Sequence, residues 1–349
     1  MGRKQHNPFG RPRGYVMALV LGTLAVFLWA GATAAWEPRK PIEWIVMAGK
    51  GGGADRITRL IQGTIMKHGW VKRPITVINK PGGAGAEALT YLMQKKGDPH
   101  VLLTTLNSFF TTPILANLPI DYTRLTPIAR IALDTFQLWV HADSKYCVGD
   151  PFSFLNDCKE TVGKCRVAGT GKGQEDSIVF AMLEDTFSTP DKPLRFTYVP
   201  YPGGGRVAKA LLGQEGGIVA TVNNPSEAIE NLRAGKIRCL ASFTAKRIEP
   251  FLGCPTFKEL GYDLQYYMTR SINAPGGLTE AQRQYWVNVM QKVYNSQEWQ
   301  SYMARKGLAP AWLTGEALLK FYAQETAKHK RLIANMPPKR REEVFGIAR

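Results

Sequence analysis

The feature that most constrains the fold of this chain is a repeated order of short apolar strand, glycine-rich loop and helix. The first such unit joins the apolar residues Ile42–Met47 to the loop 48–53, and apolar residues then recur at helical spacing from Ile57 to Ile65. Two more strands are predicted at 75–78 and 101–105. Strands that alternate with helices pair in parallel, because each helix carries the chain back across the sheet. The order therefore predicts an α/β fold.

The same order begins again near the middle of the chain, which predicts a second α/β lobe. Strands are expected at 166–168, 196–199, 218–222 and 237–242. The carboxyl-terminal part is helical in pattern, and Thr279 with Gln282 forms a capping box at the start of one helix. A stripe of apolar residues in that helix is interpreted as core: Tyr285, Trp286, Val289, Met290 and Val293.

Residues 1–35 have the pattern of a secretory signal peptide. A basic segment, 1–13, precedes the uncharged apolar run Tyr15–Gly31, and the small residues 32–35 follow. We expect cleavage near Ala35 and a mature protein in the periplasm. An uncleaved membrane anchor is the alternative, because the apolar run approaches the ~20 residues that span a bilayer.

The chain is basic, with 45 Lys and Arg against 28 Asp and Glu in 349 residues. Two basic clusters near the carboxyl terminus, Lys328–Arg331 and Lys339–Arg341, have the charge that a nucleic-acid backbone attracts. A secreted protein rarely meets nucleic acid. We therefore interpret this basic tail as a solvated helix face and predict no nucleic-acid partner.

The cysteines fit an oxidising compartment, and all of them lie in one central third of the chain: Cys147, Cys158, Cys165, Cys239 and Cys254. No CxxC motif occurs and the five histidines are scattered, which argues against zinc and against a thioredoxin-type redox site. We predict no metal site and one or two disulfides, with Cys158–Cys165 as the first choice. Buried free thiols are the alternative.

Three glycine-rich loops that follow strands have the character of anion-binding sites: 49–53, 82–85 and 203–205. Glycine lets a ligand approach the main chain, and the helix that follows presents unpaired N–H groups with a partial positive charge. In open α/β sheets, ligands bind beyond the carboxyl ends of the strands, where these loops lie. The alternative is that glycine only turns the chain.

Nucleotide cofactors do not fit these loops. The segment Gly49-x-Gly51-x-x-Ala54 matches the dinucleotide fingerprint in form, but Asn79 stands where an acidic residue should hold the ribose. No GxxxxGK[ST] motif for phosphate binding occurs. We therefore expect no cofactor.

The chain has no local motif for catalysis, since GxSxG, SxxK and HExxH are all absent from the sequence. Ser108 and Ser177 are better suited to capping a helix or contacting a ligand than to nucleophilic attack. We predict that the protein is not an enzyme and has no catalytic residue. The alternative is a secreted α/β enzyme that acts on a small carboxylate in the same cleft, and a third reading is an anchored scaffold or sensory protein.

Several segments follow one another in the order of a known family. Residues 41–59 contain an opening strand, a Gly-Gly loop and an Asp-containing helix, and 77–85 contain an Asn-x-Pro-Gly loop. The most recognisable segment is 199–205 with Leu211–Gly213. The match continues through 234–241, Lys246-Arg247 and 255–261. In this order and spacing the chain resembles the periplasmic solute-binding receptors of tripartite tricarboxylate transporters, the TctC-like or Bug receptors.

This resemblance implies a two-lobed periplasmic-binding-protein fold of type II, a Venus flytrap with two chain crossovers. Lobe I would comprise 36–136 and 256–349, and lobe II would comprise 137–255. Such a receptor captures a small organic mono- or dicarboxylate between its lobes for a membrane permease, and we expect a monomer. The ligand contacts carried over by position are Ala48, Gly49, Lys50, Gly51, Gly52, Gly53, Asp55, Asn107 and Ser108 from lobe I, and Gly169, Thr170, Gly171, Ser177, Gly203, Gly204, Gly205 and Asn223 from lobe II.

Two lysines depart from the family pattern. Lys50 enters a first loop that commonly carries prolines and a small polar residue, and Lys172 stands in a lobe II loop that is usually uncharged. Each of them either faces the ligand or faces solvent.

Overall fold

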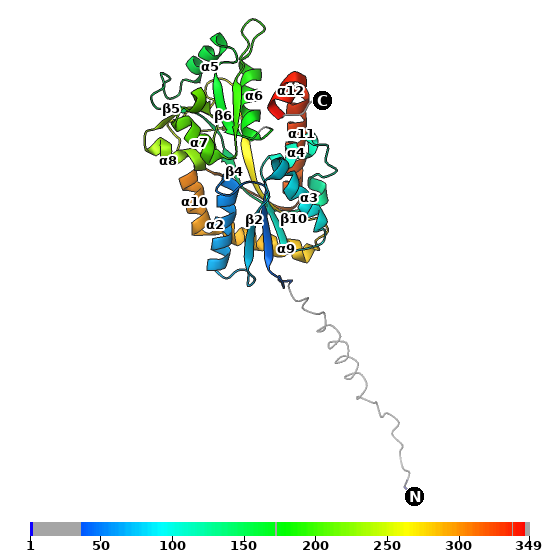
Figure 1. The fold of residues 1–349 in the computed structure, drawn as a ribbon. Helices are drawn as coiled ribbons and strands as arrows, with labels where there is room; N and C mark the ends of the chain where they lie inside the picture. Colours follow the sequence, from blue (N-terminus) through cyan, green and yellow to red (C-terminus); the bar gives the residue numbers. More distant parts are fainter. Residues whose placement is uncertain (3–35, 172, 337, 346–349) are drawn as a thin grey trace. The chain divides into compact units, whose positions relative to one another are not determined.

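The computed structural model of the protein describes residues 1–2, 36–171, 173–336 and 338–345 (Figure 1). The segment Glu37–Arg349 forms one compact unit. The predicted signal peptide, beyond its first two residues, lies outside the described residues, and so does Lys172. Among the described helices, none combines the length and the apolar character that a membrane span requires.

The first sheet is mixed and has six strands in the order β11-β4-β10-β3-β1-β2. Its strands are β1 (Ile42–Val46), β2 (Ile75–Asn79), β3 (Val101–Thr104), β4 (Leu125–Thr135), β10 (Tyr267–Pro275) and β11 (Ala309–Leu313). The helices that belong with it are α2 (Gly53–Lys67), α3 (Ala86–Gln94), α4 (Ser108–Leu115), α9 (Glu280–Asn295), α10 (Gln297–Lys306) and α11 (Gly315–Asn335). We call this sheet and its helices lobe I.

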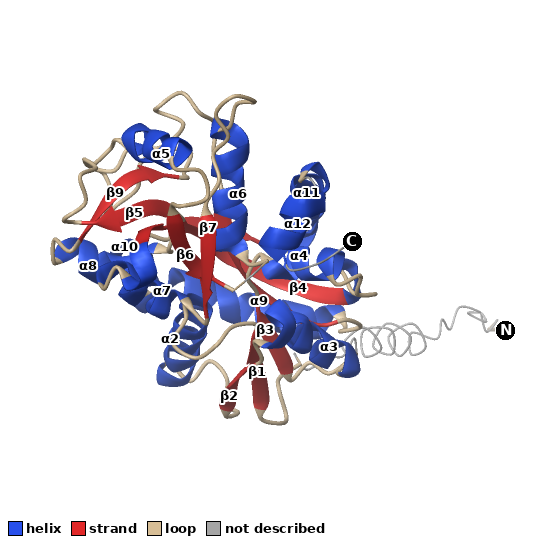
Figure 2. Ribbon diagram, turned by 45° about the horizontal axis from the view of Figure 1, so that its top comes forward, coloured by secondary structure: helices blue, strands red, loops and turns tan. Residues whose placement is uncertain are grey.

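The second sheet has five strands in the order β7-β6-β8-β5-β9, and we call it, with its helices, lobe II (Figure 2). Its strands are β5 (Gln137–His141), β6 (Arg166–Thr170), β7 (Thr197–Tyr201), β8 (Ile218–Thr221) and β9 (Ile237–Ser242). Its helices are α5 (Pro151–Glu160), α6 (Glu175–Phe187), α7 (Gly204–Leu212) and α8 (Pro225–Arg233). All the strands predicted from the sequence are present, within a few residues at each end.

The prediction of parallel pairing is correct for only part of each sheet. β1 is parallel to β2 and β3, and β6 is parallel to β7 and β8, where a helix lies between consecutive strands. β10 instead runs antiparallel between β3 and β4, and β5 runs antiparallel to β8 and β9. β4 continues into β5 through Phe136 without a helix, and β10 returns from lobe II through 243–266, so no crossover helix imposes a parallel direction.

The chain passes between the lobes at Phe136 and again between β9 and β10. The last helix, α12 (Pro338–Phe345), lies against α6 of lobe II. The Gly173 N–H donates to the Val344 carbonyl oxygen at 2.8 Å, and Arg340 pairs with the buried Glu184. The lobe boundaries predicted from the sequence assign α12 to lobe I, and they stay a prediction. The contacts of α12 that the structure describes are with lobe II.

The capping box and the apolar stripe of α9 are confirmed. The Thr279 side chain accepts a hydrogen bond from the Gln282 N–H, and the Gln282 side chain accepts one from the Thr279 N–H. Trp286, with its indole N–H donating to the Pro99 carbonyl oxygen at 2.8 Å, is fully buried. The rest of the stripe, Val289, Met290 and Val293, is buried too, while Tyr285 is half-buried.

The basic tail is not a uniformly solvated face, so that interpretation is wrong in part. His329 is fully buried, lies within 3.1 Å of the Tyr266 hydroxyl and stacks on Phe110, and burial lowers its pKa to about 4. Arg340 of α12 forms an ion pair with the buried Glu184 of α6. Lys330, Arg331 and Lys339 are exposed as expected. Along α11, buried and exposed residues alternate because one side of the helix packs on α4 and β4.

Both disulfides of the described chain lie in lobe II. Cys158 and Cys165 are bonded, which confirms the first-choice pairing, and Cys239 is bonded to Cys254. Cys147 is free and exposed. The alternative of buried free thiols is therefore wrong for four of the five cysteines.

We expect one titratable thiol per molecule in unreduced, denatured protein. Replacing Cys239 and Cys254, which are 15 residues apart, by alanine should lower the free energy of unfolding by up to roughly 3 kcal/mol, because the unfolded chain loses a loop constraint. Urea unfolding would measure this loss. Cys147→Ala is the control and should change the free energy of unfolding by less than ~0.5 kcal/mol. Three or five titratable thiols would contradict the pairing.

Candidate functional site

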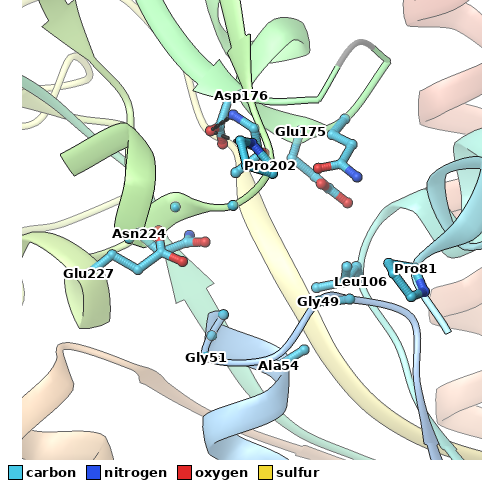
Figure 3. A pocket seen from close by; sticks show the side chains of 18 of the residues that line it. Gly49, Gly51, Ala54, Pro81, Leu106, Glu175, Asp176, Pro202, Asn224 and Glu227 are labelled. Carbon is cyan, nitrogen blue, oxygen red and sulfur yellow. Dashed lines mark hydrogen bonds between the residues drawn. The ribbon is translucent and has the colours of Figure 1, made fainter. Parts of the chain in front are cut away.

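A cavity of about 360 Å³ lies between the two lobes, at the carboxyl ends of parallel strands from both sheets (Figure 3). Loops that leave β1 and β3 contribute from lobe I, and loops that leave β6, β7 and β8 contribute from lobe II. The lining residues are Ala48, Gly49, Lys50, Gly51, Gly52, Gly53, Ala54, Pro81, Leu106, Thr170, Gln174, Glu175, Asp176, Pro202, Gly203, Gly204, Gly205, Arg206, Asn224, Glu227, Met268 and Arg270. Strand ends of this kind are where α/β proteins bind ligands.

The first loop forms the lobe I floor of the cavity. Gly51 has φ +79°, which favours glycine, and its N–H donates to the Asp55 carboxylate at 2.9 Å. A Cβ on Gly53 would lie 2.8 Å from Arg270 Nη2, so a side chain at 53 would push against this guanidinium. The N-cap of α2, Gly52, has no side chain to cap the helix. The α2 amide groups therefore remain open toward the cavity.

The glycines at 203–205 bring α7 into close contact with Glu227 of α8. A Cβ on Gly204 would lie 1.8 to 2.2 Å from the three carboxyl atoms of Glu227. The Asn223 amide nitrogen donates to the Gly204 carbonyl oxygen at 3.0 Å and to Glu227 Oε2 at 3.2 Å. Only glycine at 204 leaves room for the Glu227 carboxyl group at this position.

Three acidic side chains line the cavity: Glu175, Asp176 and Glu227 (Figure 3). Glu175 crosses from lobe II to lobe I and accepts a hydrogen bond from the Ser108 N–H, the first residue of α4, at 2.7 Å. Asp176 accepts one from the Thr170 N–H at 2.7 Å. Burial raises the pKa of Asp176 to about 8, with the charges of Glu227 and Glu175 acting in the same direction. Burial also raises the pKa of Glu175 and of Glu227.

A buried ion pair lies behind these carboxylates at the junction of the lobes. Arg270 of β10 donates to Asp134 Oδ2 through Nε at 3.2 Å and through Nη2 at 2.5 Å, and both side chains are 1% exposed or less. Arg270 also lines the cavity, and its Nη1 has no hydrogen-bond partner within the described chain. A guanidinium group that lies against the start of a helix and keeps one nitrogen unpaired is suited to receive an anion.

The structure places ten of the predicted contact residues on the cavity wall: Ala48, Gly49, Lys50, Gly51, Gly52, Gly53, Thr170, Gly203, Gly204 and Gly205. The other seven are not among the lining residues: Asp55, Asn107, Ser108, Gly169, Gly171, Ser177 and Asn223. Lys50 is exposed at the rim. That these residues contact a ligand stays a prediction.

Several of the predicted residues that do not line the cavity hold its wall in position. Asp55 holds the first loop through Gly51. Asn107 joins α4 to β10, because its amide nitrogen donates to the Tyr267 carbonyl oxygen at 2.7 Å and its Oδ1 accepts from the Thr269 N–H at 2.9 Å. Ser177 donates to the Gln174 carbonyl oxygen at 2.7 Å.

Sequence reasoning missed the charged residues of the wall other than Lys50. Glu175 and Asp176 open a helix directly after a glycine-rich loop, and Glu227 lies in the first turn after Asn223-Asn224. Acidic residues in the first turn of a helix that begins at a candidate site are a signal that could have found these three. Arg270 lies within a buried strand and has no local signal.

No group of three or more His, Cys, Asp or Glu side chains in the described ranges has the arrangement of a metal site. The acidic wall therefore consists of carboxyl groups that are hydrogen-bonded to backbone N–H groups and to an amide side chain.

The buried Asp176 should make a contribution that lowers stability as the pH rises through the neutral range. A carboxyl group with a raised folded-state pKa costs folding free energy once the unfolded chain has lost its proton. For Asp176 this window runs from about 4 to about 8, and one group contributes at most about 1.4 kcal/mol per pH unit. Glu184, whose pKa burial raises to about 7, acts in the same direction.

Asp176→Asn should flatten this pH dependence, because asparagine still accepts from the Thr170 N–H but cannot ionise. Urea unfolding of the ligand-free protein between about pH 5 and pH 8 would measure the slope. Asp185→Asn, at an exposed position on the same helix, is the matched control. An unchanged slope in Asp176→Asn would contradict the prediction. The charges that face Asp176 are those of Glu175 and Glu227.

Comparison with known proteins relates the chain to one family. The sequence model of the "Tripartite tricarboxylate transporter family receptor", TctC, matches residues 57–337. A curated protein of Cupriavidus necator, "UPF0065 protein in gbd 5'region", is 24% identical over 308 residues, which cover 88% of this chain and 90% of that protein.

Solved structures agree with this relationship. A TctC solute-binding protein from Polaromonas, crystallised with no ligand, is 27% identical, with a TM-score of 0.66 and coverage of 86% of this chain and 99% of that chain. An R. palustris protein with adipate is 20% identical, with a TM-score of 0.75 and coverage of 85% of this chain and 97% of that chain. The predicted binding-protein fold is thereby confirmed.

Proposed function

Because the chain belongs to the receptor family of the tripartite tricarboxylate transporters and is a solute-binding protein, we propose that it captures a small organic carboxylate in the cavity between its lobes. The observation that carries the proposal is that the start of α2, which no side chain caps, and the Arg270 guanidinium group lie together in the lining of that cavity. Backbone amides at a helix start and a guanidinium group both favour a carboxylate. The adipate in the R. palustris structure, which shares this fold, supports the same ligand class.

In this proposal the ligand carboxylate lies against the loop 48–53 and beside Arg270. The loop 203–205 and Thr170 close the cavity from lobe II. Side-chain contacts among the described residues already join the lobes around it, including Glu175 to Ser108, Arg56 Nη1 to the Ser226 carbonyl oxygen at 3.1 Å, Asn224 to the Thr135 carbonyl oxygen at 2.8 Å, and Lys306 to Glu230 at 3.1 Å. A bound ligand would add its own contacts with both lobes to these side-chain contacts. It would therefore favour the closed arrangement of the lobes.

The family membership also supports the cellular role. The protein would act as a monomer in the periplasm after removal of residues 1–35 and deliver its ligand to the membrane permease subunits. Intact-mass analysis of periplasmic protein tests the first part, since a mass that retains 1–35 would contradict it. The division into lobes at 136/137 and 255/256 belongs to the same proposal, with α12 placed against lobe II.

The alternative of an enzyme has one feature in its favour, the buried Asp176 with its pKa raised to about 8. A receptor returns its ligand unchanged, whereas an enzyme converts it. Incubation of the purified protein with each ligand that it binds, followed by mass spectrometry, separates the two. Turnover that is lost in Asp176→Asn would favour the enzyme.

The ligand class is tested by thermal-shift measurements with a panel of aliphatic and aromatic mono- and dicarboxylates. At a hundredfold excess over its dissociation constant, a ligand should stabilise the protein by about 2.7 kcal/mol. We expect at least one carboxylate to do so and neutral sugars to have no effect. A panel in which only a sugar or a nucleotide shifts the melting temperature would contradict the proposal.

A further inference from the structure

Carboxyl groups of the protein already occupy most of the positions where a ligand anion would be expected. Glu175 accepts from the first N–H of α4, and Asp176 accepts from the Thr170 N–H at the end of β6. Both also stand in the first turn of α6. The Glu227 carboxyl group lies against Gly204 at the start of α7 and itself stands in the first turn of α8. The starts of α4, α6, α7 and α8 are thus supplied with acidic groups from within the chain.

The start of α2 is different. Its N-cap, Gly52, offers no side chain, and no acidic side chain of the cavity wall lies against Gly53, whose nearest neighbour is Arg270. Asp55 stands in the first turn of α2, but its carboxylate accepts hydrogen bonds from the Gly51 N–H, Arg59 and Asn79, and Asp55 is not among the residues that line the cavity. Arg270, which is 1% exposed, is on this side of the cavity, since its Nη2 is the atom nearest to a Cβ on Gly53, and its Nη1 has no hydrogen-bond partner within the described chain. One anion position therefore remains open.

The charge of the opposite wall is not balanced. No ion pair between Glu175, Asp176 or Glu227 and a lysine or arginine occurs within the described ranges, while Arg270 is already paired with Asp134. The two remaining cations of the lining are exposed, and Arg206 is bonded to Glu215. Because burial raises the pKa of all three carboxyl groups, a second ligand carboxylate would have to meet them in their protonated form, whereas a ligand cation would favour their charged form. A protonated nitrogen would meet three acceptors.

Building on the proposed function, we propose that the ligand is a zwitterionic amino carboxylate. Its carboxylate lies at the start of α2 beside Arg270, and its protonated nitrogen lies against Glu175, Asp176 and Glu227. The separation of the two walls within one cavity selects for molecules that carry both groups.

The test compares probes that differ only in the cationic nitrogen: glycine betaine with 3,3-dimethylbutyrate, β-alanine with propionate, and L-aspartate with succinate. Isothermal titration calorimetry measures each dissociation constant. A charged hydrogen bond predicts that, in the pair that fits the cavity, the amino member binds at least roughly tenfold more tightly. Propylamine, which has the cation without the carboxylate, should not bind.

Two variants test whether the wall formed by Glu175, Asp176 and Glu227 distinguishes the amino member of each pair from its partner without nitrogen. Glu227→Gln should weaken the amino member at least roughly tenfold and leave its partner without nitrogen unchanged or tighter. Glu160→Gln, at the end of α5 in the same lobe with its side chain 66% exposed, is the matched control and should change neither. Melting curves confirm that both variants are folded.

The outcomes separate this inference from the proposed function. If members without nitrogen bind as tightly as amino members in every pair, or if Glu227→Gln weakens both members equally, the zwitterion is wrong and the carboxylate receptor stands. If propylamine binds as tightly as β-alanine, the carboxylate has no role and both proposals are wrong. If no probe of any pair and no carboxylate of the panel binds, both are overturned.

Discussion

A single methyl group at residue 204 should remove ligand binding and leave the fold intact. In Gly204→Ala the new Cβ would overlap the Glu227 carboxyl group, which has to leave the cavity wall and its Asn223 partner. The added methyl also covers the start of α7. We expect the dissociation constant of the best ligand to rise at least roughly a hundredfold, measured by calorimetry.

The neighbouring glycine provides the control for this change. A Cβ on Gly205 meets nothing within 4 Å, so Gly205→Ala adds the same methyl to the same helix without displacing Glu227. Both variants should melt within a few degrees of the unmodified protein, since alanine is favoured over glycine within a helix. Normal binding by Gly204→Ala would show that neither Glu227 nor the start of α7 contacts the ligand.

Breaking the ion pair at the lobe junction should cause the largest loss of stability. Arg270→Met leaves the Asp134 carboxylate fully buried, with only the Thr135 N–H as a remaining donor. Removing one partner of a buried pair typically costs about 3–5 kcal/mol, which corresponds to a decrease in melting temperature on the order of 10 °C. Urea unfolding and calorimetric melting would measure it.

Two further variants define the origin of that loss. Replacing both partners, Arg270→Met with Asp134→Leu, should recover much of the stability, because no uncompensated charge remains in the interior. Glu280→Gln breaks the pair with Arg283, in which the glutamate is 72% exposed, and should cause a much smaller loss, because solvent screens this pair. If Arg270→Met is no more destabilising than Glu280→Gln, the buried pair does not stabilise the junction.

The sequence was sufficient to predict the strands that alternate with helices. β1, β2, β3, β6, β7 and β8 each combine an apolar run with a following glycine-rich or Asn-containing turn, and these are local signals. β4 and β10 carry no such mark. β10 is buried along nearly its whole length and contains Arg270 and Asn273, whose partners lie more than 45 residues away. A strand of this kind depends on tertiary contacts that no local pattern records.

The candidate site was predictable in its backbone and not in its charges. Gly51 has a positive φ, and Gly204 packs closely against Glu227. Both positions require glycine, so both can be recognised from the sequence. The contacts of Glu175 with Ser108 and of Glu227 with Gly204 join residues 67 and 23 positions apart. Which acidic residues face the cavity depends on the relative position of the two lobes. The sequence pattern contains no measure of that position.

The strand order of lobe I has a consequence for the kinetics of folding. Its sheet combines strands from residue 42 to residue 313, so it cannot be completed until almost the whole chain is available. The five strands of lobe II lie within 137–242, and both disulfides lie close to them. Contacts that are distant in sequence form slowly because a long loop has to close first. Lobe II should therefore nucleate early, and Trp139, the one tryptophan between residues 137 and 255, should become buried before Trp44 and Trp286 during refolding.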